Sequence, residues 1–342
     1  MREVRRMEAG GGGWKPVVHV TRLIPEPGPV LLAEIFDLAG DLENRNPTRE
    51  ELAQGLRAAD AVVCTLRERF DQALIAEAGP RLRVLSNMAV GYDNIDVAAA
   101  TARGILVTNT PGVLTETTAD LTWALILAAS RRVVEGDRMV RAGEFHGWTP
   151  TMLLGRDVHG KTLGIVGMGS IGRAVARRAG GFDMRVLYTR RSGPLGPGEV
   201  PSGALWEYRD ELRELIRESD FVSLHVPLSE ATRHLLGPRE FAAMRSGAVL
   251  VNTSRGPVVD EPALVGALRD GPLSAAGLDV YENEPQLTPG LARLPNVVLL
   301  PHLGSASIET RGRMAELAAR NAIAAVLGRP VPHPVNPEVL RR

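Results

Sequence analysis

Short apolar runs rich in β-branched residues alternate along this chain with longer amphipathic stretches. From Pro16 onward, a first series contains the runs VVHVT, AVVCT, LRVLSN and ILVTNT, and amphipathic stretches such as VLLAEIFDLAG lie between several of them. Strands that alternate with helices are typical of parallel sheets with crossover helices. The pattern therefore predicts an α/β fold that begins at about Pro16.

A long amphipathic pattern separates this first series from a second one. It runs from about Thr115 to Ala142 and predicts one helix, capped by Thr115, that bridges two domains. The second series contains six candidate strands, namely KTLGIVG, RVLYT, FVSLHV, AVLVNTS, SAAGLDV and NVVLL. Six strands with interleaved helices predict a doubly wound sheet. A last helix, roughly Ala306 to Leu327, carries the chain back to the first domain, and an extended Pro-rich segment follows.

Composition narrows the class of protein. A chain of 342 residues with 44% hydrophobic residues is long enough for two domains that each bury a core. Forty basic side chains balance forty acidic ones, so we expect a small-molecule partner and neither nucleic acid nor a membrane. The longest apolar run, LTWALILAAS, is shorter than the roughly 20 residues of a membrane-spanning helix.

The cysteine content and the N-terminal residues bear on the cellular compartment of the protein. The single cysteine, Cys64, lies in an apolar run and predicts a buried core residue, which excludes a disulfide framework and fits a reducing cytoplasm. Residues 1–15 include the glycines Gly10 to Gly13 and lack the apolar stretch of a secretory signal. They predict a flexible tail, and an alternative translation start is an equally good interpretation.

The segment GIVGMGSIGRAVARRAGGF places Gly167, Gly169 and Gly172 between a β-branched strand and a helix. A GxGxxG string alone is a weak signal in a chain with 36 glycines, but this context strengthens it. Gly167 suits a tight turn, Gly169 lets the backbone approach a pyrophosphate, and Gly172 lets helix and strand pack closely. The N–H groups at the start of the helix favour an anion. The segment predicts a dinucleotide site.

The strand that follows this segment bears on which nicotinamide cofactor is bound. Sites that prefer NAD place an Asp or Glu about twenty residues after the glycines, where it accepts hydrogen bonds from the ribose. This chain has Arg190 and Arg191 there, and their guanidinium groups suit a 2′-phosphate. NADP(H) is therefore the predicted cofactor, with NAD(H) possible. The alternative interpretation is that both arginines are merely solvated.

Four polar residues follow strands of the second series, where the reactive groups of a doubly wound fold lie. They are Arg255 after VLVNTS, Asp279 and Glu284 after SAAGL, and His302 after NVVLLP. Reduction of a 2-keto acid needs a cation for the carboxylate and carbonyl and an acid that protonates the oxygen. Arg255 and His302 meet these needs, and a carboxylate such as Glu284 favours the imidazolium form of a neighbouring histidine.

Several motifs together resemble one known family. The motifs NMAVGYDNID, PGVLTETTADLTWALIL, GKTLGIVGMGSIG, LVNTSRGPVVDEPAL, GLDVYENEP and PHLGS occur in this order between about Pro16 and Pro337. The chain resembles the D-isomer-specific 2-hydroxyacid dehydrogenases over nearly its whole length. Within that family it is most similar to the glyoxylate and hydroxypyruvate reductases.

The resemblance implies roles for individual residues. Arg255, Glu284 and His302 take the catalytic positions, with His302 as proton donor, and the amides of Val90 and Gly91 bind the substrate carboxylate. Arg255 and His302 also contact the substrate. Besides the residues named above, the cofactor-binding positions implied by the resemblance are Ser170, Ile171, Ser192, Pro227, Thr253, Ser254, Asp279 and Gly304.

The resemblance also implies the architecture. A flavodoxin-like substrate domain, residues 16–114 and 306–342, is interrupted by a Rossmann cofactor domain, residues 115–305, and both have doubly wound parallel sheets. Closure of the cleft between the domains excludes water during hydride transfer. The family further implies a homodimer held largely by the cofactor domains.

Other functions remain open at this stage. A phosphoglycerate dehydrogenase is the nearest enzyme alternative, although no regulatory domain follows the last helix. Formate dehydrogenase is disfavoured because that branch replaces the glutamate by an amide. A dinucleotide-sensing corepressor is the alternative outside enzymes. The physiological keto acid and the direction of the reaction do not follow from the sequence, because one methylene in a pocket discriminates by only about 1–3 kcal/mol.

Some further residues bear on these alternatives. Arg67 stands where related reductases carry a small hydroxyl residue, so it either favours a second acidic group on the substrate or points to solvent. Asp93 and Asp96 fit turn and cap positions. His225 is interpreted as structural or as part of the cleft wall. No metal is predicted, because no HExxH or paired-cysteine spacing occurs.

Overall fold

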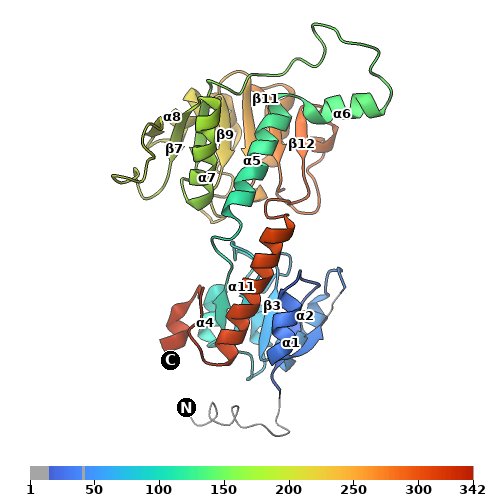
Figure 1. Cartoon of the computed structure of the whole chain (residues 1–342), viewed down its shortest axis with the longest axis vertical. Coiled ribbons are helices and arrows are strands. Elements are labelled where there is room, and N and C mark those ends of the chain that lie inside the picture. Colours follow the sequence, from blue (N-terminus) through green and yellow to red (C-terminus); the bar gives the residue numbers. More distant parts are fainter. Residues whose placement is uncertain (1–14, 41–42, 342) are drawn as a thin grey trace. The chain divides into compact units, whose positions relative to one another are not determined.

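The computed structural model describes residues 15–40 and 43–341, which form two compact units (Figure 1). Unit 1 comprises the chain up to Leu114 together with the chain from Ala306, and unit 2 runs from Thr115 to Ser305. The predicted tail lies outside the described residues except for Lys15, whose Nζ donates to the Ala33 carbonyl at 3.0 Å. Within the described residues, no helix is both long and apolar enough to cross a bilayer.

Unit 1 contains a five-stranded sheet in the order β2-β1-β3-β4-β5, and every neighbouring pair is parallel. This is the flavodoxin-like order that the resemblance implied. The strands are β1 (Val17–Val20), β2 (Asp37–Gly40), β3 (Ala61–Cys64), β4 (Val84–Asn87) and β5 (Leu106–Thr108). The helices are α1 (Gly28–Ile35), α2 (Arg49–Ala58), α3 (Gln72–Ala76), α4 (Val97–Ala102) and α11 (Ile308–Val326).

Side-chain caps fix where α2, α3 and α4 begin, and Ser307 caps α11 in the same way. The Thr48 hydroxyl accepts a hydrogen bond from the backbone N–H of Glu51 at 3.2 Å at the start of α2. Asp71 caps α3, and Asp96 caps α4 by accepting from the N–H of Ala99 at 2.9 Å. These bonds satisfy N–H groups that have no partner inside the helix. The cap predicted at Asp96 is confirmed.

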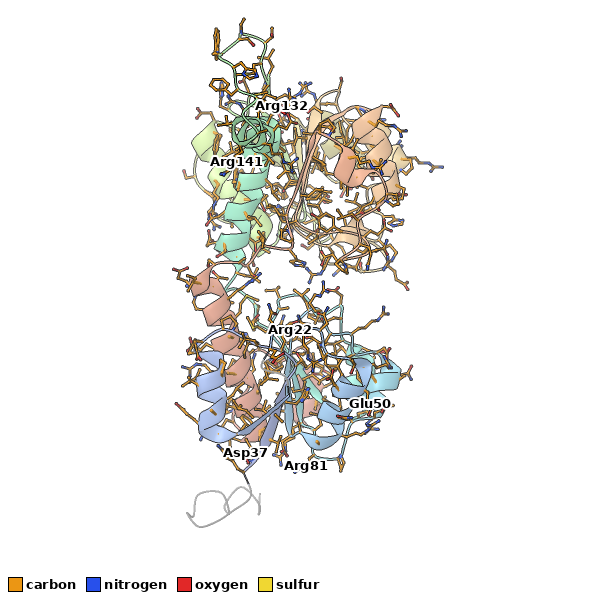
Figure 2. The ribbon with its side chains drawn as sticks, turned by 90° about the vertical axis from the view of Figure 1, so that its right-hand side faces the viewer. Arg22, Asp37, Glu50, Arg81, Arg132 and Arg141 are labelled. Atoms are coloured by element: carbon orange, nitrogen blue, oxygen red, sulfur yellow. The ribbon has the colours of Figure 1, made fainter. Side chains whose placement is uncertain are left out.

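The sheet of unit 1 is buried on both faces. Because successive side chains of a strand point to opposite faces, Ala61 and Val63 of β3 pack with α1 and α11, whereas Val62 and Cys64 pack with α2 and α3. Cys64 is fully buried, as predicted, and burial raises the pKa of its thiol well above the ordinary value. Figure 2 shows Arg22, which follows β1, at the opposite end of unit 1 from Asp37, where β2 begins.

Unit 2 contains a seven-stranded parallel sheet in the order β12-β11-β10-β9-β6-β7-β8. The order reverses between β6 and β9, as in dinucleotide-binding folds. The strands are β6 (Thr162–Val166), β7 (Arg185–Thr189), β8 (Trp206–Tyr208), β9 (Phe221–Leu224), β10 (Ala248–Asn252), β11 (Leu273–Leu278) and β12 (Val297–Leu299). The helices are α5 (Thr115–Ser130), α6 (Val133–Arg141), α7 (Ser170–Ala179), α8 (Leu212–Glu218), α9 (Pro238–Ala243) and α10 (Glu261–Arg269).

Helices cover both faces of this second sheet. On one face α5 and α7 pack on alternate residues of the central strands, such as Ile165, and lie side by side in Figure 1. On the other face α8, α9 and α10 pack on residues such as Leu250. Short 3₁₀ helices also occur, at Gly180–Phe182, Gly256–Val258, Leu291–Arg293 and Pro337–Arg341. The last of these interrupts the C-terminal segment that was predicted to be extended.

The long helix predicted from Thr115 to Ala142 is wrong, because the chain breaks between α5 and α6. Arg132 has a left-handed backbone with φ 54°, which ends the helical path. A returning segment explains the break: the N–H of Arg156 donates to the Ser130 carbonyl at 2.8 Å. A Cβ on Gly155 would lie 2.3 Å from that same carbonyl oxygen, so the returning chain fills the space next to the helix end. The contact is nonlocal and leaves no local pattern.

Two strands were missing from the prediction. β2 lies inside VLLAEIFDLAG, whose first half forms α1, so a helix and a strand follow one another within a single apolar run. β8 is the strand of unit 2 that the six predicted strands did not include. It is three residues long and lies at the edge of the sheet. Its central residue, Glu207, is exposed. A short edge strand with a charged residue has no alternating apolar pattern to reveal it.

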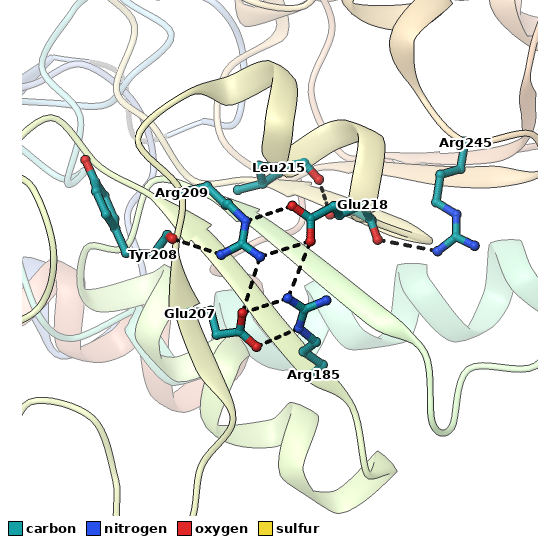
Figure 3. A network of polar contacts seen from close by, with 8 residues as sticks. Arg185, Glu207, Tyr208, Arg209, Leu215, Glu218 and Arg245 are labelled. Carbon is teal, nitrogen blue, oxygen red and sulfur yellow. Dashed lines mark hydrogen bonds and ion pairs between the residues drawn. The ribbon is translucent and has the colours of Figure 1, made fainter.

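Ion pairs hold this edge strand (Figure 3). Arg185 of β7 contacts both oxygens of Glu207 at 2.7 and 2.6 Å, and Arg209 contacts both oxygens of Glu218 at 2.8 and 2.9 Å. The Nη2 of Arg209 also reaches Glu207 at 3.3 Å. Such forked contacts favour the charged carboxylate. The pKa of Glu207 is accordingly lowered to about 2, chiefly by Arg185.

We expect the Glu207 network to make unit 2 sensitive to acid. A carboxylate whose pKa is lowered on folding stabilises the fold above its unfolded pKa, near 4.5, and this stabilisation is lost as pH falls toward 2. Thermal unfolding followed between pH 6 and pH 2.5 should show that Glu207→Gln is less stable than the wild type at pH 6. The two proteins should converge at the acid end, and a difference independent of pH would contradict this role.

Candidate active site

Glu284 and His302 are in direct contact at the carboxyl-end edge of the sheet of unit 2. Nδ1 of His302 lies 3.2 Å from Oε1 and 3.1 Å from Oε2 of Glu284. Glu284 follows β11 and His302 follows β12, and these two strands are neighbours in the sheet. The side chain of Glu284 is 22% exposed and that of His302 is 28% exposed, so the pair is accessible to a ligand. With Nδ1 directed at the carboxylate, Nε2 is the atom left for a substrate.

Asp279 organises the backbone around His302. Its Oδ1 accepts from the N–H of Leu303 at 2.6 Å and its Oδ2 from the N–H of Gly304 at 2.7 Å. The N–H of His302 itself donates to the Asp279 carbonyl at 3.0 Å. These three bonds hold His302 in a left-handed backbone with φ 58°, a conformation that histidine rarely adopts. Burial raises the pKa of Asp279, against the opposing effect of the two N–H donors and of His302.

A reciprocal pair of bonds fixes the loop that carries Glu284. The N–H of Glu282 donates to Oε1 of Glu261 at 2.7 Å, and the N–H of Glu261 donates to Oε2 of Glu282 at 3.2 Å. The buried Glu261 carboxylate also accepts from the Thr288 hydroxyl at 2.6 Å. Glu261 therefore connects both sides of the loop to the start of α10. An acidic residue at the start of a helix is favourable in any helix, so the sequence gives no specific signal for these bonds.

His234 is a second histidine with a carboxylate partner. Its Nε2 lies 2.6 Å from Oε1 of Glu282, and its side chain is 44% exposed. It lies in a turn and not at the end of a strand, where the reactive groups were predicted. The contact attaches the segment before α9 to the same loop that carries Glu284.

Arg255 follows β10 in a loop that Asn252 shapes. The Asn252 amide donates to the Arg255 carbonyl at 3.0 Å and accepts from the N–H of Ser254 at 3.0 Å and from its hydroxyl at 2.8 Å. The Nη1 of Arg255 donates to the Ser254 carbonyl at 2.9 Å. A Cβ on Gly256 would lie 1.8 Å from the carbonyl carbon of Tyr281. The arginine loop and the loop that carries Glu284 therefore touch backbone to backbone.

Buried threonines of α5 complete this part of the site. The Thr118 hydroxyl donates to the Gly304 carbonyl at 3.0 Å, and the Thr122 hydroxyl donates to the Thr118 carbonyl at 2.8 Å. The hydroxyls of Thr122 and Thr253 lie 2.9 Å apart. Threonines four residues apart share one face of a helix, but the sequence pattern does not reveal what that face meets. The predicted residues Thr253 and Gly304 are thus attached to α5.

The three glycines between β6 and α7 have different surroundings. Gly167 has φ 101°, and a Cβ there would lie 2.5 Å from the His225 carbonyl oxygen. A Cβ on Gly172 would lie 2.2 Å from the Gly167 carbonyl oxygen. A Cβ on Gly169 would meet nothing within 4 Å, although this residue caps α7. Gly167 and Gly172 thus serve packing, whereas the space beside Gly169 and the first residues of α7, Ser170 and Ile171, fits a pyrophosphate.

We expect Gly169→Ala and Gly172→Ala to have opposite effects. In Gly169→Ala the methyl group enters open space, so the melting temperature should stay within about 2 °C while the Kd for the nicotinamide cofactor rises at least tenfold. In Gly172→Ala the methyl group collides with backbone, so stability should fall by about 1–3 kcal/mol. Thermal unfolding and cofactor titration by fluorescence measure both quantities. Unchanged cofactor affinity in Gly169→Ala would contradict the assignment of the open space.

The predicted 2′-phosphate residues follow β7. Arg190 comes directly after the strand, and its Nε is buried without a hydrogen-bond partner among the described residues. Arg191 and Ser192 are exposed in the turn that follows. Pro227 lies beyond the end of β9, and its carbonyl accepts from the Thr232 hydroxyl at 2.7 Å. An orphaned guanidinium nitrogen suits a phosphate oxygen, so these residues fit a phosphorylated ribose.

Glu199 is a further charged residue that the sequence did not single out. Arg173 on the first turn of α7 contacts Glu199 at 2.7 Å, and the N–H of Gly196 donates to the same carboxylate at 2.6 Å. Both contacts lower the pKa of Glu199, the Gly196 bond most strongly. The pair fixes the loop after β7 against the helix of the glycine motif.

His225 is partly buried just beyond the end of β9. Its Nε2 lies 2.8 Å from the Ser223 hydroxyl, and burial lowers its pKa to about 3. It therefore remains neutral across the physiological range, which fits both interpretations of this residue, as structural or as part of the cleft wall. No group of three or more His, Cys, Asp or Glu side chains is arranged for a metal ion in the part of the chain that the structure describes.

In unit 1, Val90 and Gly91 follow β4 with their carbonyl groups held. Asn109 donates to the Val90 carbonyl at 2.8 Å, and Asn87 donates to the Gly91 carbonyl at 2.9 Å. The N–H groups of both residues have no acceptor among residues 15–40 and 43–341. Both N–H groups are therefore available to donate to an anion.

Comparison with known proteins identifies the family. Residues 123–304 match the family model described as D-isomer specific 2-hydroxyacid dehydrogenase, NAD binding domain. This chain belongs to that family. It is 52% identical to a glyoxylate reductase of Korarchaeum cryptofilum, over 96% of this chain and 98% of the relative. It is 50% identical to a glyoxylate reductase of Pyrococcus furiosus, over 96% of this chain and 97% of the relative.

A solved structure agrees with these relatives. The NADPH-dependent glyoxylate/hydroxypyruvate reductase of Sinorhizobium meliloti, in complex with NADP and malonate, superimposes with a TM-score of 0.84. Its sequence is 33% identical, and the match covers 94% of this chain and 97% of that one. The resemblance inferred from the motifs is confirmed at the level of family and fold.

Proposed function

We propose that this protein is a glyoxylate reductase that reduces glyoxylate and similar small 2-keto acids, such as hydroxypyruvate, with a reduced nicotinamide cofactor. The observation that carries this proposal is the contact of His302 with Glu284, with the backbone at His302 held by Asp279. The loop that carries Arg255 touches the loop that carries Glu284 at Gly256. The names of the relatives support the same substrate class.

The geometry supports a defined role for each side chain. Glu284 faces Nδ1 of His302, which orients the ring and leaves Nε2–H to protonate the substrate oxygen. Arg255 offers a planar donor group that holds the carboxylate and polarises the neighbouring carbonyl. The reduced nicotinamide, when bound, supplies the hydride to the carbonyl carbon. In the reverse direction, neutral His302 accepts the hydroxyl proton at Nε2.

The two units have separate roles in this proposal. Unit 2 holds the cofactor along the glycine motif and carries the three catalytic side chains, which agrees with the family model that its residues match. Unit 1 is the substrate domain, and the free N–H groups of Val90 and Gly91 bind the substrate carboxylate. A cytoplasmic location stays a prediction from composition.

Initial rates of cofactor oxidation test the activity. Purified protein should turn over glyoxylate and hydroxypyruvate faster than pyruvate with NADPH. Absence of turnover with every keto acid would contradict the reductase and favour a sensor that binds the cofactor without chemistry. In that case a partner whose binding depends on the cofactor should be found.

NADPH is the proposed cofactor in preference to NADH. The buried Nε of Arg190 lacks a partner among the described residues, and no carboxylate directly follows β7 to bind a ribose hydroxyl. We expect kcat/KM for NADPH to exceed that for NADH at least tenfold. Replacement of Arg190 and Arg191 by alanine should remove most of this preference by weakening NADPH alone. Equal weakening for both cofactors would contradict a 2′-phosphate contact.

A homodimer is also proposed, through α6 and the loop that follows it. Figure 1 shows this segment standing out from the rest of unit 2. Val133, Val140, Phe145, Trp148 and Leu154 are between 49% and 77% exposed, a concentration of apolar side chains typical of contact surfaces. Sedimentation should give a dimer for the wild type and a monomer for the double variant Val140→Asp with Trp148→Asp. A monomeric wild type would contradict the dimer.

A further inference from the structure

A hollow of about 340 Å³ lies in unit 1 at the carboxyl ends of β1 and β3. The strand order β2-β1-β3 reverses direction there, and ligands of doubly wound folds bind at such reversals. The volume is at the lower end of the range for small-molecule pockets. The lining residues are Arg22, Asn46, Pro47, Arg49, Leu52, Arg67, Glu68 and Arg69. We refer to this hollow as the arginine pocket.

Two of the four arginines in this pocket are already neutralised. Arg22 binds the buried Glu68, with its Nε at 2.7 Å from Oε1, and the Thr21 and Thr65 hydroxyls also donate to this carboxylate. Arg49 contacts both oxygens of Asp71 at 2.9 and 2.8 Å. The Arg22–Glu68 pair therefore forms a rigid floor that carries no net charge.

The other two arginines leave the pocket positive. Arg67 and Arg69 are exposed, and neither guanidinium has a hydrogen bond or ion pair within the described ranges. They flank Glu68 in sequence and line the same hollow, so their charges converge there. Two exposed guanidinium groups without a hydrogen-bonded partner among the described residues, over a neutral floor, favour an oxyanion ligand.

The pocket is joined to the loop that we propose binds the substrate carboxylate. The Asn94 amide donates to the carbonyls of Thr65 and Glu68, both at 3.0 Å. The Asn87 amide donates to Asn94 Oδ1 at 3.2 Å and to the Gly91 carbonyl at 2.9 Å. The segment that carries the unpaired arginines and the segment that carries Gly91 are thus cross-linked within unit 1.

We propose that the arginine pocket binds a second anionic group of the substrate, a carboxylate or a phosphate at the end of the molecule remote from the keto acid. This inference rests on the proposed function and specifies its substrate class. The enzyme accepts glyoxylate, which has no second anionic group, but its specificity favours keto acids that do. Arg67 and Arg69 hold that group, and Val90 and Gly91 hold the first carboxylate.

Steady-state kinetics with matched substrates test this assignment. Phosphohydroxypyruvate and 2-oxoglutarate carry a second anionic group, whereas hydroxypyruvate and glyoxylate do not. Arg67→Ser and Arg67→Ser with Arg69→Ser should lower kcat/KM for one or both dianionic substrates about tenfold more than for glyoxylate, mainly through KM. Arg81→Ser removes an equal charge at the opposite end of unit 1 (Figure 2). It should leave the ratio of kcat/KM for either dianionic substrate to kcat/KM for glyoxylate unchanged. Equal losses on all substrates, or none, would overturn the proposal.

A binding measurement separates this proposal from the reductase proposal. Absence of turnover of glyoxylate by the wild type would refute the reductase, and with it the assignment of the pocket to a substrate. Calorimetric titration with malonate and with inorganic phosphate then reports on the pocket itself. Binding to the wild type that is weakened in Arg67→Ser identifies a site for a free anion, whereas equal binding to both proteins refutes the pocket altogether.

Discussion

Replacing His302 by asparagine is expected to lower kcat for glyoxylate reduction by a factor of about 10² to 10⁴, the usual contribution of a positioned acid. Asparagine tolerates the left-handed backbone that His302 adopts, so the bonds from Asp279 to Leu303 and Gly304 should persist. Only the proton donor is then lost. Stopped-flow measurement of hydride transfer, together with cofactor titration, separates the chemical step from binding.

Glu284→Gln is the matched control for this variant. The amide keeps the shape of the side chain and removes the carboxylate that orients the His302 ring through Nδ1, so kcat should fall, but less than in His302→Asn. The Kd for NADPH should remain within about threefold of the wild type in both variants. If His302→Asn retains most of its kcat, another group supplies the proton.

Gly256→Ala is expected to cause the largest loss of stability among the single variants considered. The new methyl group would lie 1.8 Å from the carbonyl carbon and 1.9 Å from the carbonyl oxygen of Tyr281, and both atoms belong to backbone that cannot rotate away. Overpacking of this kind costs about 3 kcal/mol or more, equivalent to roughly 6–12 °C in melting temperature for a domain of this size. Thermal unfolding by circular dichroism measures the loss.

Gly266→Ala provides the comparison within the same region. Gly266 lies inside α10, and a Cβ there meets nothing within 4 Å. Because glycine inside a helix costs about 0.5–1 kcal/mol relative to alanine, Gly266→Ala should be neutral or slightly stabilising. Any Gly256→Ala protein that folds should also have a lower kcat, since Tyr281 precedes the loop that carries Glu284. Equal melting temperatures for the two variants would contradict the contact.

Features that depend on the local sequence pattern could be predicted from the sequence alone. Strands such as β3 and β10 are buried throughout and almost entirely apolar, and parallel topology follows from their alternation with helices. The contact of Glu284 with His302 could be anticipated because both residues follow strands, and the ends of neighbouring parallel strands share one edge. Likewise, the strand-to-helix context distinguished the glycine motif from a chance match.

Features that depend on nonlocal contacts were not predictable from one sequence. The end of α5 is set by Gly155 and Arg156, which lie about 25 residues further along the chain. Glu261 looked like an ordinary acidic residue at a helix start, and its bonds to the Glu284 loop arise only when α10 meets that loop. β8 depends on ion pairs with its neighbours and not on apolar alternation.

The burial of Cys64 has a practical consequence. It is the only thiol in the sequence, it is fully buried in unit 1, and its raised pKa suppresses the reactive thiolate. A maleimide reagent should therefore leave the native protein unmodified and label the chain only when unit 1 opens. Pulsed labelling during urea titration would then report the opening of one unit without a signal from the other. For the same reason, a cysteine introduced at an exposed position accepts a fluorophore at that position alone.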